Sequence, residues 1–439
     1  MNFRNHLILF TLLIVALTAN SQTTKSLTLD EAVRLGIESS QQLKATGARL
    51  GVSKAKTHQF RNTLIPNVSL NSAYTRVSDN IAPFSIVLPG TTDALVLNPQ
   101  VLNQFSNRVS LQEVVFTGFR AKNYLESALF LERAATLDVE RDRIEVKNNI
   151  IAAYLNLFKL QSSKAVLLEN TNVLRGRLND VKNLVKSGTA LENDQLKAEI
   201  AVSQLELSSK DVDNAIEVAN FNMDLMLGLP TDTRIEVDDK TISEQKDLSG
   251  LDAYLKSVDG RPDLAAADLR RQATVKGVDI AHGAYYPTIS VGANYFYNNP
   301  NQRVFPQQDA FKGTWDMGIQ LSYNLTSLYT TKAQIQEAQA NVVAANAQKQ
   351  QLADMAKMEV NANFHAYQSA MDKIKLTEKT IVQTTENQRV MKNRYQAQVS
   401  TIGELLDADA LVLQAKINLE IAKADLVAAY YKLQKSVGK

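Results

Sequence analysis

The stretch TWDMGIQLSYNL, Thr314 to Leu325, alternates apolar and polar residues along its whole length. The apolar residues share one face of an extended chain: Trp315, Met317, Ile319, Leu321, Tyr323 and Leu325. The residues between them are small or polar: Asp316, Gly318, Gln320, Ser322 and Asn324. This period of two over about ten residues predicts a β-strand. Ten residues is also the length of a strand that crosses a membrane.

A second strand is predicted just upstream, with Ile289, Val291, Ala293, Tyr295 and Tyr297 on one side. Together the two strands form an expected β-hairpin over residues 287–325. Residues 66–117 predict a matching hairpin, whose strands are separated by a Pro-, Gly- and Asn-containing stretch, 77–106. We expect that stretch to be a long, fairly apolar loop.

The two hairpins belong to an internal repeat. RNTLIPNVSLNSAY (61–74) lies over HGAYYPTISVGANY (282–295) at an offset of 221 residues. VVFTGF (114–119) lies over YNLTSL (323–328) at an offset of 209, so the first copy carries 12 extra residues, which fall in 77–106. The sequence therefore predicts two halves of one design, residues 22–228 and 261–439, with a linker region at 229–260.

Each half also predicts long helices. The pattern Thr28-x-x-Glu31 is a capping box, so a helix should begin near Thr28. Neither Gly nor Pro occurs between Leu328 and Ile402, and a helix from Ala121 to Lys186 would be on the order of 100 Å long. Apolar residues recur at heptad spacing: Val146, Ala153, Leu160, Leu167, Leu174 and Val181, and again Val360, Tyr367, Ile374 and Ile381. We predict helical hairpins over 120–228 and 328–436.

Composition excludes several classes of protein. The chain has 439 residues, a net charge of +2 and no cysteine. A nucleic-acid partner is therefore not expected, and disulfides, thiolate metal sites and cysteine nucleophiles are impossible. Residues 1–21 have a basic start and a short apolar run, which predicts a cleaved secretory signal.

These features together predict a membrane barrel shared between copies of the chain. Strand edges cannot stay unpaired in lipid, and four strands cannot close around a lumen. Three copies would supply twelve strands, enough for an aqueous channel, and the helices would leave the membrane together as a tube. The alternative is a small soluble sheet that caps a coiled coil.

The order of these segments resembles the TolC-like outer membrane efflux proteins. Short stretches spread over almost the whole mature chain carry the resemblance: TLDEA (28–32), IPNVSL (65–70), VVFTG (114–118), KSGTALEND (186–194), RPDL (261–264), YYPTISV (285–291) and ELLDADA (404–410). The family implies an α+β fold: a homotrimer in outer-membrane lipid, with a twelve-stranded barrel and a periplasmic α-barrel. Its function would be the exit duct of a tripartite efflux pump, together with a periplasmic adaptor protein and an inner-membrane transporter. A duct for type I protein secretion is the alternative within the family. Residues 229–260 and the chain ends would form a belt around the tube.

The resemblance also implies where the sites lie. Two acids narrow the periplasmic mouth in this family, and here they are Glu404 and Asp407, three residues apart on one helix face. Glu404 could instead cap its helix, since Thr401-x-x-Glu404 and Thr189-x-x-Glu192 both fit a capping box. Asp409 is expected to be solvated. The adaptor would contact the two turns at Gly188, Thr189, Leu191, Ser400, Thr401 and Gly403. The membrane interface would hold Trp315, Tyr295, Tyr297 and Tyr323.

No enzyme, cofactor or metal site is expected. His58, His282 and His365 stand in no metal-binding spacing, and the chain has no P-loop and no dinucleotide-binding glycine motif. Two further classes remain as rivals: a structural trimeric coiled coil at the cell surface, and a periplasmic adaptor protein. The first predicts strands gathered at one terminus, and the second predicts one helical hairpin between compact β-domains.

Overall fold

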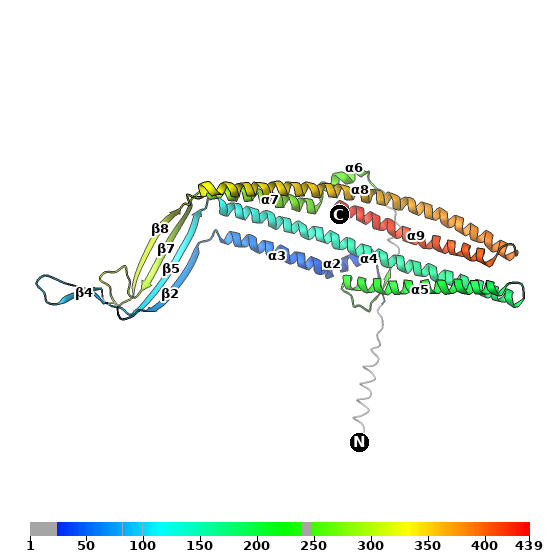
Figure 1. The fold of residues 1–439 in the computed structure, drawn as a ribbon, viewed down its shortest axis with the longest axis horizontal. Helices are drawn as coiled ribbons and strands as arrows, with labels where there is room; N and C mark the ends of the chain where they lie inside the picture. Colours follow the sequence, from blue (N-terminus) through cyan, green and yellow to red (C-terminus); the bar gives the residue numbers. More distant parts are fainter. Residues whose placement is uncertain (1–23, 81, 99, 239–247) are drawn as a thin grey trace, which may run out of the picture. The chain divides into compact units, whose positions relative to one another are not determined.

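The computed structural model describes residues 24–80, 82–98, 100–238 and 248–439 (Figure 1). The predicted signal segment, 1–21, lies outside these residues. Two compact units make up the described chain. The first unit contains residues 24–47, 138–264 and 351–439, and the second contains 48–137 and 265–350. Four helices have residues in both units: α3 (Gln41–Asn62), α4 (Arg120–Lys186), α7 (Pro262–His282) and α8 (Ser327–Gln396).

The second unit is built on a four-stranded antiparallel sheet of order β2-β5-β7-β8 (Figure 1). Its strands are β2 (Asn67–Arg76), β5 (Asn103–Phe116), β7 (Thr288–Asn298) and β8 (Lys312–Ser322). The contact between β5 and β7 joins the two hairpins predicted from the sequence, so strands from residues about 180 positions apart become neighbours. Strands β2 and β8 are the two edges of the sheet.

The stretch predicted as a loop, 77–106, contains a small hairpin of its own. Strand β3 (Phe84–Val87) pairs with β4 (Ala94–Asn98), and these two form a separate two-stranded sheet. The runs FSIV and ALVLN are rich in β-branched and apolar residues, which favour extended pairs. The predicted long connection therefore contains nine residues in a short hairpin, whose presence the sequence interpretation left open.

The sheet meets the helices at a tight junction. Gly118 has a φ of +64°, a left-handed conformation that favours glycine. A Cβ atom on Gly118 would lie 2.4 Å from the carbonyl oxygen of Gly283, in the short 3-10 helix η3 (Gly283–Tyr285). Glycine is thus required at this position of the VVFTG motif for two reasons: the positive φ, and the lack of room for a Cβ atom.

The first unit surrounds a parallel strand pair, β1 (Thr24–Leu27) and β6 (Arg234–Val237). Around it pack helices from distant parts of the chain: α2 (Leu29–Ser39), α4, α5 (Glu192–Leu227) and α9 (Ile402–Ser436). The hydroxyl of Tyr154, in α4, donates to the carbonyl oxygens of Leu27 (2.8 Å) and Asp238 (3.2 Å). One buried helix residue therefore ties down the ends of both strands.

The predicted helix features are confirmed in this unit. Thr28 is the N-cap of α2, where its hydroxyl accepts from the Glu31 amide and its own amide donates to Glu31. Every residue of the two predicted heptad series is buried or half-buried. The remaining helix positions are largely solvated, as expected of long helices with narrow packing seams.

The RPDL motif anchors the end of the chain. Arg261 lies between η2 (Val258–Gly260) and α7, following α6 (Leu251–Ser257). Its guanidinium donates to Asp263, to Glu359 of α8 and to the carbonyl of Ser436 in α9, each at 2.8 Å. Three segments are thus held by one largely buried cation, a site that Arg fills better than Lys because its donors form a fixed fork.

One buried carboxylate lies where α5 ends. Asp224 is fully buried and accepts from Asn220 Nδ2 at 3.0 Å. Burial, with a smaller repulsion from Asp232, raises its pKa to about 6. Because the folded protein binds this proton more tightly than the unfolded chain, the contribution of Asp224 to stability falls as pH rises from about 4 to about 6.

We predict that Asp224→Asn stabilises the protein at pH 7.5, by roughly 1–3 kcal/mol, and changes its stability little near pH 4. Thermal unfolding of the detergent-solubilised protein at both pH values measures this. Asp232→Asn is the matched control and should give a smaller gain in the same direction. An Asp224→Asn protein that is no more stable than the parent at pH 7.5 would contradict the assignment.

Candidate functional site

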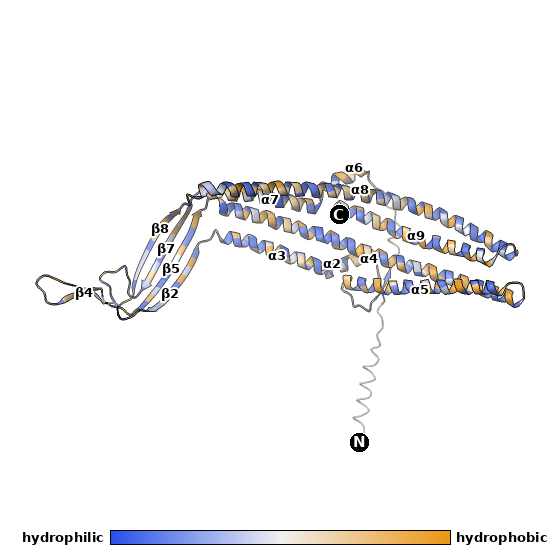
Figure 2. Ribbon diagram, in the orientation of Figure 1, coloured by the Kyte–Doolittle hydropathy of each residue, from blue (hydrophilic) through white to orange (hydrophobic). Residues whose placement is uncertain are grey.

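The strand pairing gathers apolar side chains on one face of the four-stranded sheet. Residues of β7 pair with residues of β8 on this face: Ile289 with Leu321, Val291 with Ile319, Ala293 with Met317, and Tyr295 with Trp315. In β8 the side chains of Trp315, Met317, Ile319 and Leu321 are 65–77 % exposed. The predicted alternation is confirmed, and Figure 2 shows it as alternating colours along the strands. Such an uncovered apolar band is typical of a lipid-facing surface.

Two groups of aromatic residues border this apolar band. Near the β7–β8 connection, Phe311 stacks on Tyr297 (centroids 5.1 Å apart) and Phe105 contacts both Phe311 and Tyr74. The predicted interface residues Trp315 and Tyr295 are cross-strand partners beside this group. Aromatic girdles at both interfaces are characteristic of membrane barrels.

The second group lies at the helix end of the sheet. Phe116, Phe119 and Tyr286 contact one another edge to face, with centroids 5.4–6.2 Å apart. Tyr323 directly follows β8, eight residues after Trp315, or roughly 26 Å along an extended strand. Sequence reasoning found Tyr323 but missed the other three, because they come from separate segments and only the fold brings them together.

The two turns that reverse the long helices have the same geometry. After α4, the amides of Gly188 and Thr189 donate to the carbonyls of Val185 and Leu184. After α8, the amides of Gln398 and Val399 donate to Tyr395 and Arg394, an identical pattern 210 residues later. Gly188 and Gln398 both have positive φ, at 76° and 60°. The turns pack together through Val181 of α4 and Ile402 and Leu405 of α9.

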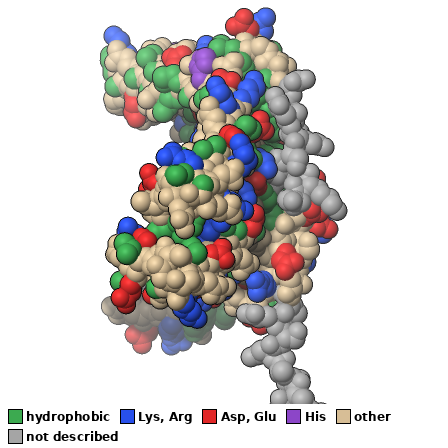
Figure 3. All heavy atoms as spheres, turned by 90° about the vertical axis from the view of Figure 1, so that its right-hand side faces the viewer, with side chains coloured by type: hydrophobic (Ala, Val, Ile, Leu, Met, Phe, Trp, Pro, Cys, Tyr) green, Lys and Arg blue, Asp and Glu red, His purple; other side chains and the backbone are tan. Residues whose placement is uncertain are grey.

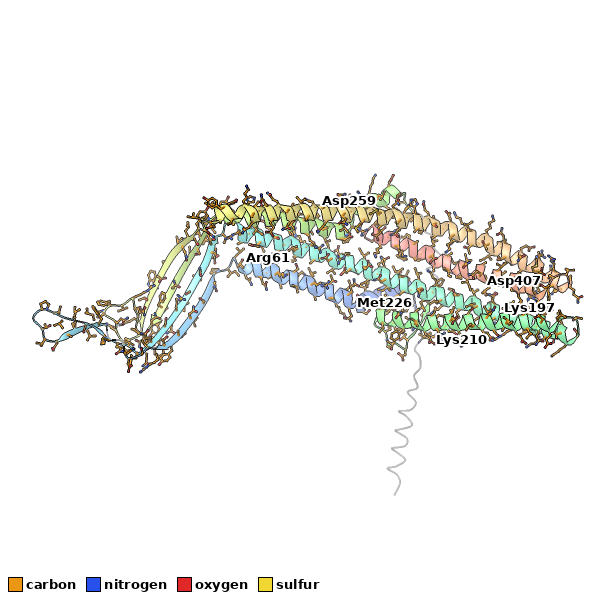
Figure 4. All side chains as sticks on the ribbon, in the orientation of Figure 1. Arg61, Lys197, Lys210, Met226, Asp259 and Asp407 are labelled. Carbon is orange, nitrogen blue, oxygen red and sulfur yellow. The ribbon has the colours of Figure 1, made fainter. Side chains whose placement is uncertain are left out.

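Glu404 is part of a helix cap. Its carboxylate accepts from the Thr401 amide at 2.8 Å, and its own amide donates to the Thr401 hydroxyl at 3.3 Å. The predicted capping box is therefore present, and the side chain remains exposed to solvent. Asp407, one turn further along α9, is exposed as well, and Figure 4 labels it together with Lys197 of α5.

The capping box predicted at Thr189 and Glu192 was wrong. Helix α5 begins after Leu191, and the carboxylate of Asp194 accepts from the Leu191 amide at 3.3 Å. The hydroxyl of Thr189 instead donates to the carbonyl of Leu184 in the preceding helix. A capping box also needs an N-cap side chain that accepts from a backbone amide of the first turn, and leucine has no acceptor atom. At this helix start the Asp194 side chain therefore satisfies the Leu191 amide, and the N-cap side chain satisfies none.

Asp409 was expected to be solvated, and this prediction was also wrong. It is 3 % exposed. Its carboxylate forms an ion pair with Arg177 of α4 (3.4 Å) and accepts from Gln388 of α8 (2.6 Å). Positions two residues apart on a helix face different directions, so Asp409 points into the helix packing and Asp407 does not. This polar contact links three helices next to the turns.

We predict that Asp409→Ala destabilises this end of the first unit by roughly 3 kcal/mol, because it leaves Arg177 half-buried without its carboxylate. Hydrogen–deuterium exchange over α8 and α9 near the turns should accelerate. Glu386→Ala is the control, since it removes an exposed ion pair with Arg389, which is screened by solvent and should contribute little to stability. The idea fails if both variants exchange alike. Arg177→Met with Asp409→Leu should recover most of the loss.

Most of the predicted adaptor-contact residues lie on the surface. Gly188, Thr189, Leu191 and Thr401 are exposed, and Ser400 and Gly403 are half-exposed. Leu191 is an exposed apolar side chain at the first turn, and the second turn exposes Val399, which the sequence reasoning did not single out. Acidic and basic side chains are interspersed on the face seen in Figure 3.

In the parts of the chain that the structure describes, no three His, Cys, Asp or Glu side chains are placed to hold a metal ion. Within the same ranges, no helix combines the length and the hydropathy of a membrane span.

The second half of the chain is similar to a known family of outer-membrane proteins. Residues 254–439 match the family model described as "Outer membrane efflux protein". "Toxin and drug export protein A" of Aggregatibacter actinomycetemcomitans is 21 % identical over 330 residues, which is 72 % of this chain and 71 % of that protein. The matched family is one of outer-membrane channels rather than of enzymes, and the named relative is an export protein.

Solved structures have the same fold. The outer membrane protein VceC from Vibrio cholerae superposes with a TM-score of 0.77 at 17 % identity, covering 93 % of this chain and 96 % of that one. CusC gives a TM-score of 0.80 at 15 % identity, covering 93 % and 91 %. The resemblance to TolC-like outer membrane efflux proteins is thereby confirmed, and the protein is an outer-membrane protein with a helical part in the periplasm.

Proposed function

We propose that the protein is the outer-membrane exit duct of a tripartite efflux pump. It passively conducts substrates that a periplasmic adaptor and an inner-membrane transporter deliver. One observation carries the proposal: a four-stranded sheet with an uncovered apolar face continues into helices of 67 and 70 residues. A chain built this way has a part suited to lipid and a part long enough to cross an aqueous compartment.

The sheet edges support a trimer. Strands β2 and β8 are both edges, and unpaired backbone groups in lipid cost several kcal/mol each. Pairing β8 of one copy with β2 of the next removes every edge only when the ring closes. Three copies would give a twelve-stranded barrel with an aqueous lumen, whereas four strands alone cannot close around one.

The two equivalent turns support an internal duplication. Their matching hydrogen bonds at a constant offset of 210 residues favour halves of common design, residues 22–228 and 261–439. Six helical hairpins from three copies would then form the periplasmic tube. The 229–260 region and the chain ends would form a belt around it. Contacts of β1 with β6 and of Arg261 with Ser436 support this, since they join both chain ends to that region.

Glu404 and Asp407 are our candidates for the periplasmic constriction. Both side chains are exposed on α9 at its turn end, three residues apart. The cap engages one oxygen of the Glu404 carboxylate, Oε2, and leaves the rest of the side chain exposed to solvent. Three copies would bring six carboxylates around the axis, a ring that attracts cations and opposes anions. In the first half the corresponding residues are Asp194 and Lys197, whose charges offset each other.

The turns would also be where the adaptor binds. Leu191 and Val399 give each turn an exposed apolar side chain beside small and polar residues, a composition suited to contact with another protein. The roles of Trp315, Tyr295, Tyr297 and Tyr323 would be to anchor the barrel at the two membrane interfaces. A duct for type I secretion is the second candidate, favoured by the relative whose name includes both toxin and drug export.

The proposed function predicts a trimer that conducts ions. Detergent-solubilised protein should run as a heat-sensitive oligomer of three chains, and it should form channels in a planar bilayer. Mass determination in detergent and single-channel recording measure these two properties. A monomeric protein that still conducts ions would contradict the proposal. A cell-surface coiled-coil protein would be trimeric without conducting.

We further predict that Glu404→Gln with Asp407→Asn weakens block by polyvalent cations about tenfold, because it removes the ring's charge. Gln retains the helix cap, so the turn should remain folded. Glu386→Gln is the control, as it removes an exposed charge on α8 outside the proposed ring. Unchanged cation block in the double variant would show that the constriction lies elsewhere.

A further inference from the structure

Residues 299–311 connect β7 to β8, and Asn301 and Arg303 in this connection lie on the polar face of the sheet. Asn301 is buried, and its amide nitrogen donates to the carbonyl of Lys312 (2.9 Å) and to the hydroxyl of Thr314 (3.1 Å). Thr314 alternates with Trp315 along β8, so it lies on the face opposite the apolar band. The amide of Arg303 in turn donates to Asn301 Oδ1 at 2.9 Å. The first residues of this connection are therefore held on the polar side.

Arg303 fastens the connection to two strands. Its guanidinium lies over the ring of Phe296 in β7, 4.3 Å from the centroid, and forms an ion pair with Asp316 in β8. Asp316 is oriented by Asn294, whose amide donates to it at 2.7 Å. Phe296, Asn294 and Asp316 all belong to the polar face by strand alternation. A guanidinium between an aromatic ring and a carboxylate is a specific arrangement, which Arg can make because it is planar and charged.

The polar face beside this fastening is cationic. A hollow of about 710 Å³ lies between the connection and strands β2, β5 and β7, and Arg108 and Arg303 both line it. Lys312 is exposed at the start of β8, on the same face. Two carboxylates oppose these three cations: Asp316 on the polar face, which pairs with Arg303, and Asp309 in the connection, which accepts from Asn299 Nδ2 at 3.0 Å. Arg108, Arg303 and Lys312 therefore leave one positive charge in excess per chain.

We propose that residues 299–311 form an inward lip at the outer mouth of the duct and that Arg303 holds this lip in place. The inference rests on the proposed function, because the polar face lines a lumen only if copies of the chain form a channel. In a ring of three copies the lips would narrow the outer opening, and the guanidinium groups of Arg108 would surround it. The opening would then hold back large solutes and disfavour cations, the opposite preference to the acidic ring proposed at the periplasmic end.

The absence of cysteine from the chain allows a direct test. Ser106 lines the hollow, so Ser106→Cys places a single thiol on the polar face beneath the lip. Membrane-impermeant maleimides are added to intact cells: a small anionic reagent, a cationic reagent of equal size and a polymer-linked reagent. We expect the anionic reagent to react faster than the cationic one, and the polymer to react slowly.

Arg303→Ala in the same protein should accelerate the polymer reaction about fivefold or more and reduce the preference for the anionic reagent. Asp316→Asn removes the other partner of the ion pair and should also accelerate the polymer reaction. Arg303→Lys keeps the charge but loses the planar contact with Phe296, so it should keep the preference for the anionic reagent and only part of the restriction on the polymer. Arg76→Ala is the matched control, because Arg76 lies at the same end of the sheet and pairs there with Asn103. It should leave all three rates unchanged.

The results of this experiment test the proposed lip and the proposed duct independently. If the small reagents do not reach Ser106→Cys from outside, the polar face does not line an outward-open channel, and the proposed function fails. If they do reach it but Arg303→Ala and Asp316→Asn leave the polymer rate unchanged, the duct stands and the lip is overturned. Heat-sensitive oligomers in the same membranes verify that each variant has assembled. If one variant does not assemble, the other decides the result.

Discussion

The backbone groups along β2 and β8 need hydrogen-bond partners that a single chain does not provide. In lipid no water can replace those partners, so the open edges favour the association of copies that we propose. The apolar face of the sheet favours a location in lipid, because side chains such as Ile319, which is 77 % exposed, are unfavourable in water. The helices follow the strands directly in the chain, so any symmetry adopted by the sheet is passed on to them.

The two units obey different packing rules. In the second unit the strands place apolar residues on one exposed face of the sheet and small or polar residues on the other. In the first unit the helices bury a narrow apolar seam and solvate the rest, with Tyr154 and Arg261 fixing backbone groups from distant segments. The sheet is thus suited to contact with lipid, and the helices are suited to contact with water. Gly118 and Gly283 mark the point where strands give way to helices, and their close backbone approach leaves no room for a side chain.

Much of the candidate site followed from local pattern. The pairing of Tyr295 with Trp315 was implied by two alternating runs, because the period of two sets which residues share a face. Glu404 was recognised as a possible cap from four consecutive residues, and that cap is present. Asp409 was misjudged, since helical spacing shows which way a residue points relative to its neighbours and not what it meets there. Its partners, Arg177 and Gln388, lie 232 and 21 residues away.

The sequence alone determined the four long strands, the long helices, the capping box at Thr28 and the apolar strand face. All of these depend on interactions between residues close in the chain, or on a periodicity that one segment carries by itself. Only the tertiary structure decided that β5 lies beside β7, that Asp409 is buried, and that Asn301 and Arg303 lie on the polar face of the sheet. These features depend on contacts between distant segments. Their free energy comes from shared burial and paired charges, which no single segment contains.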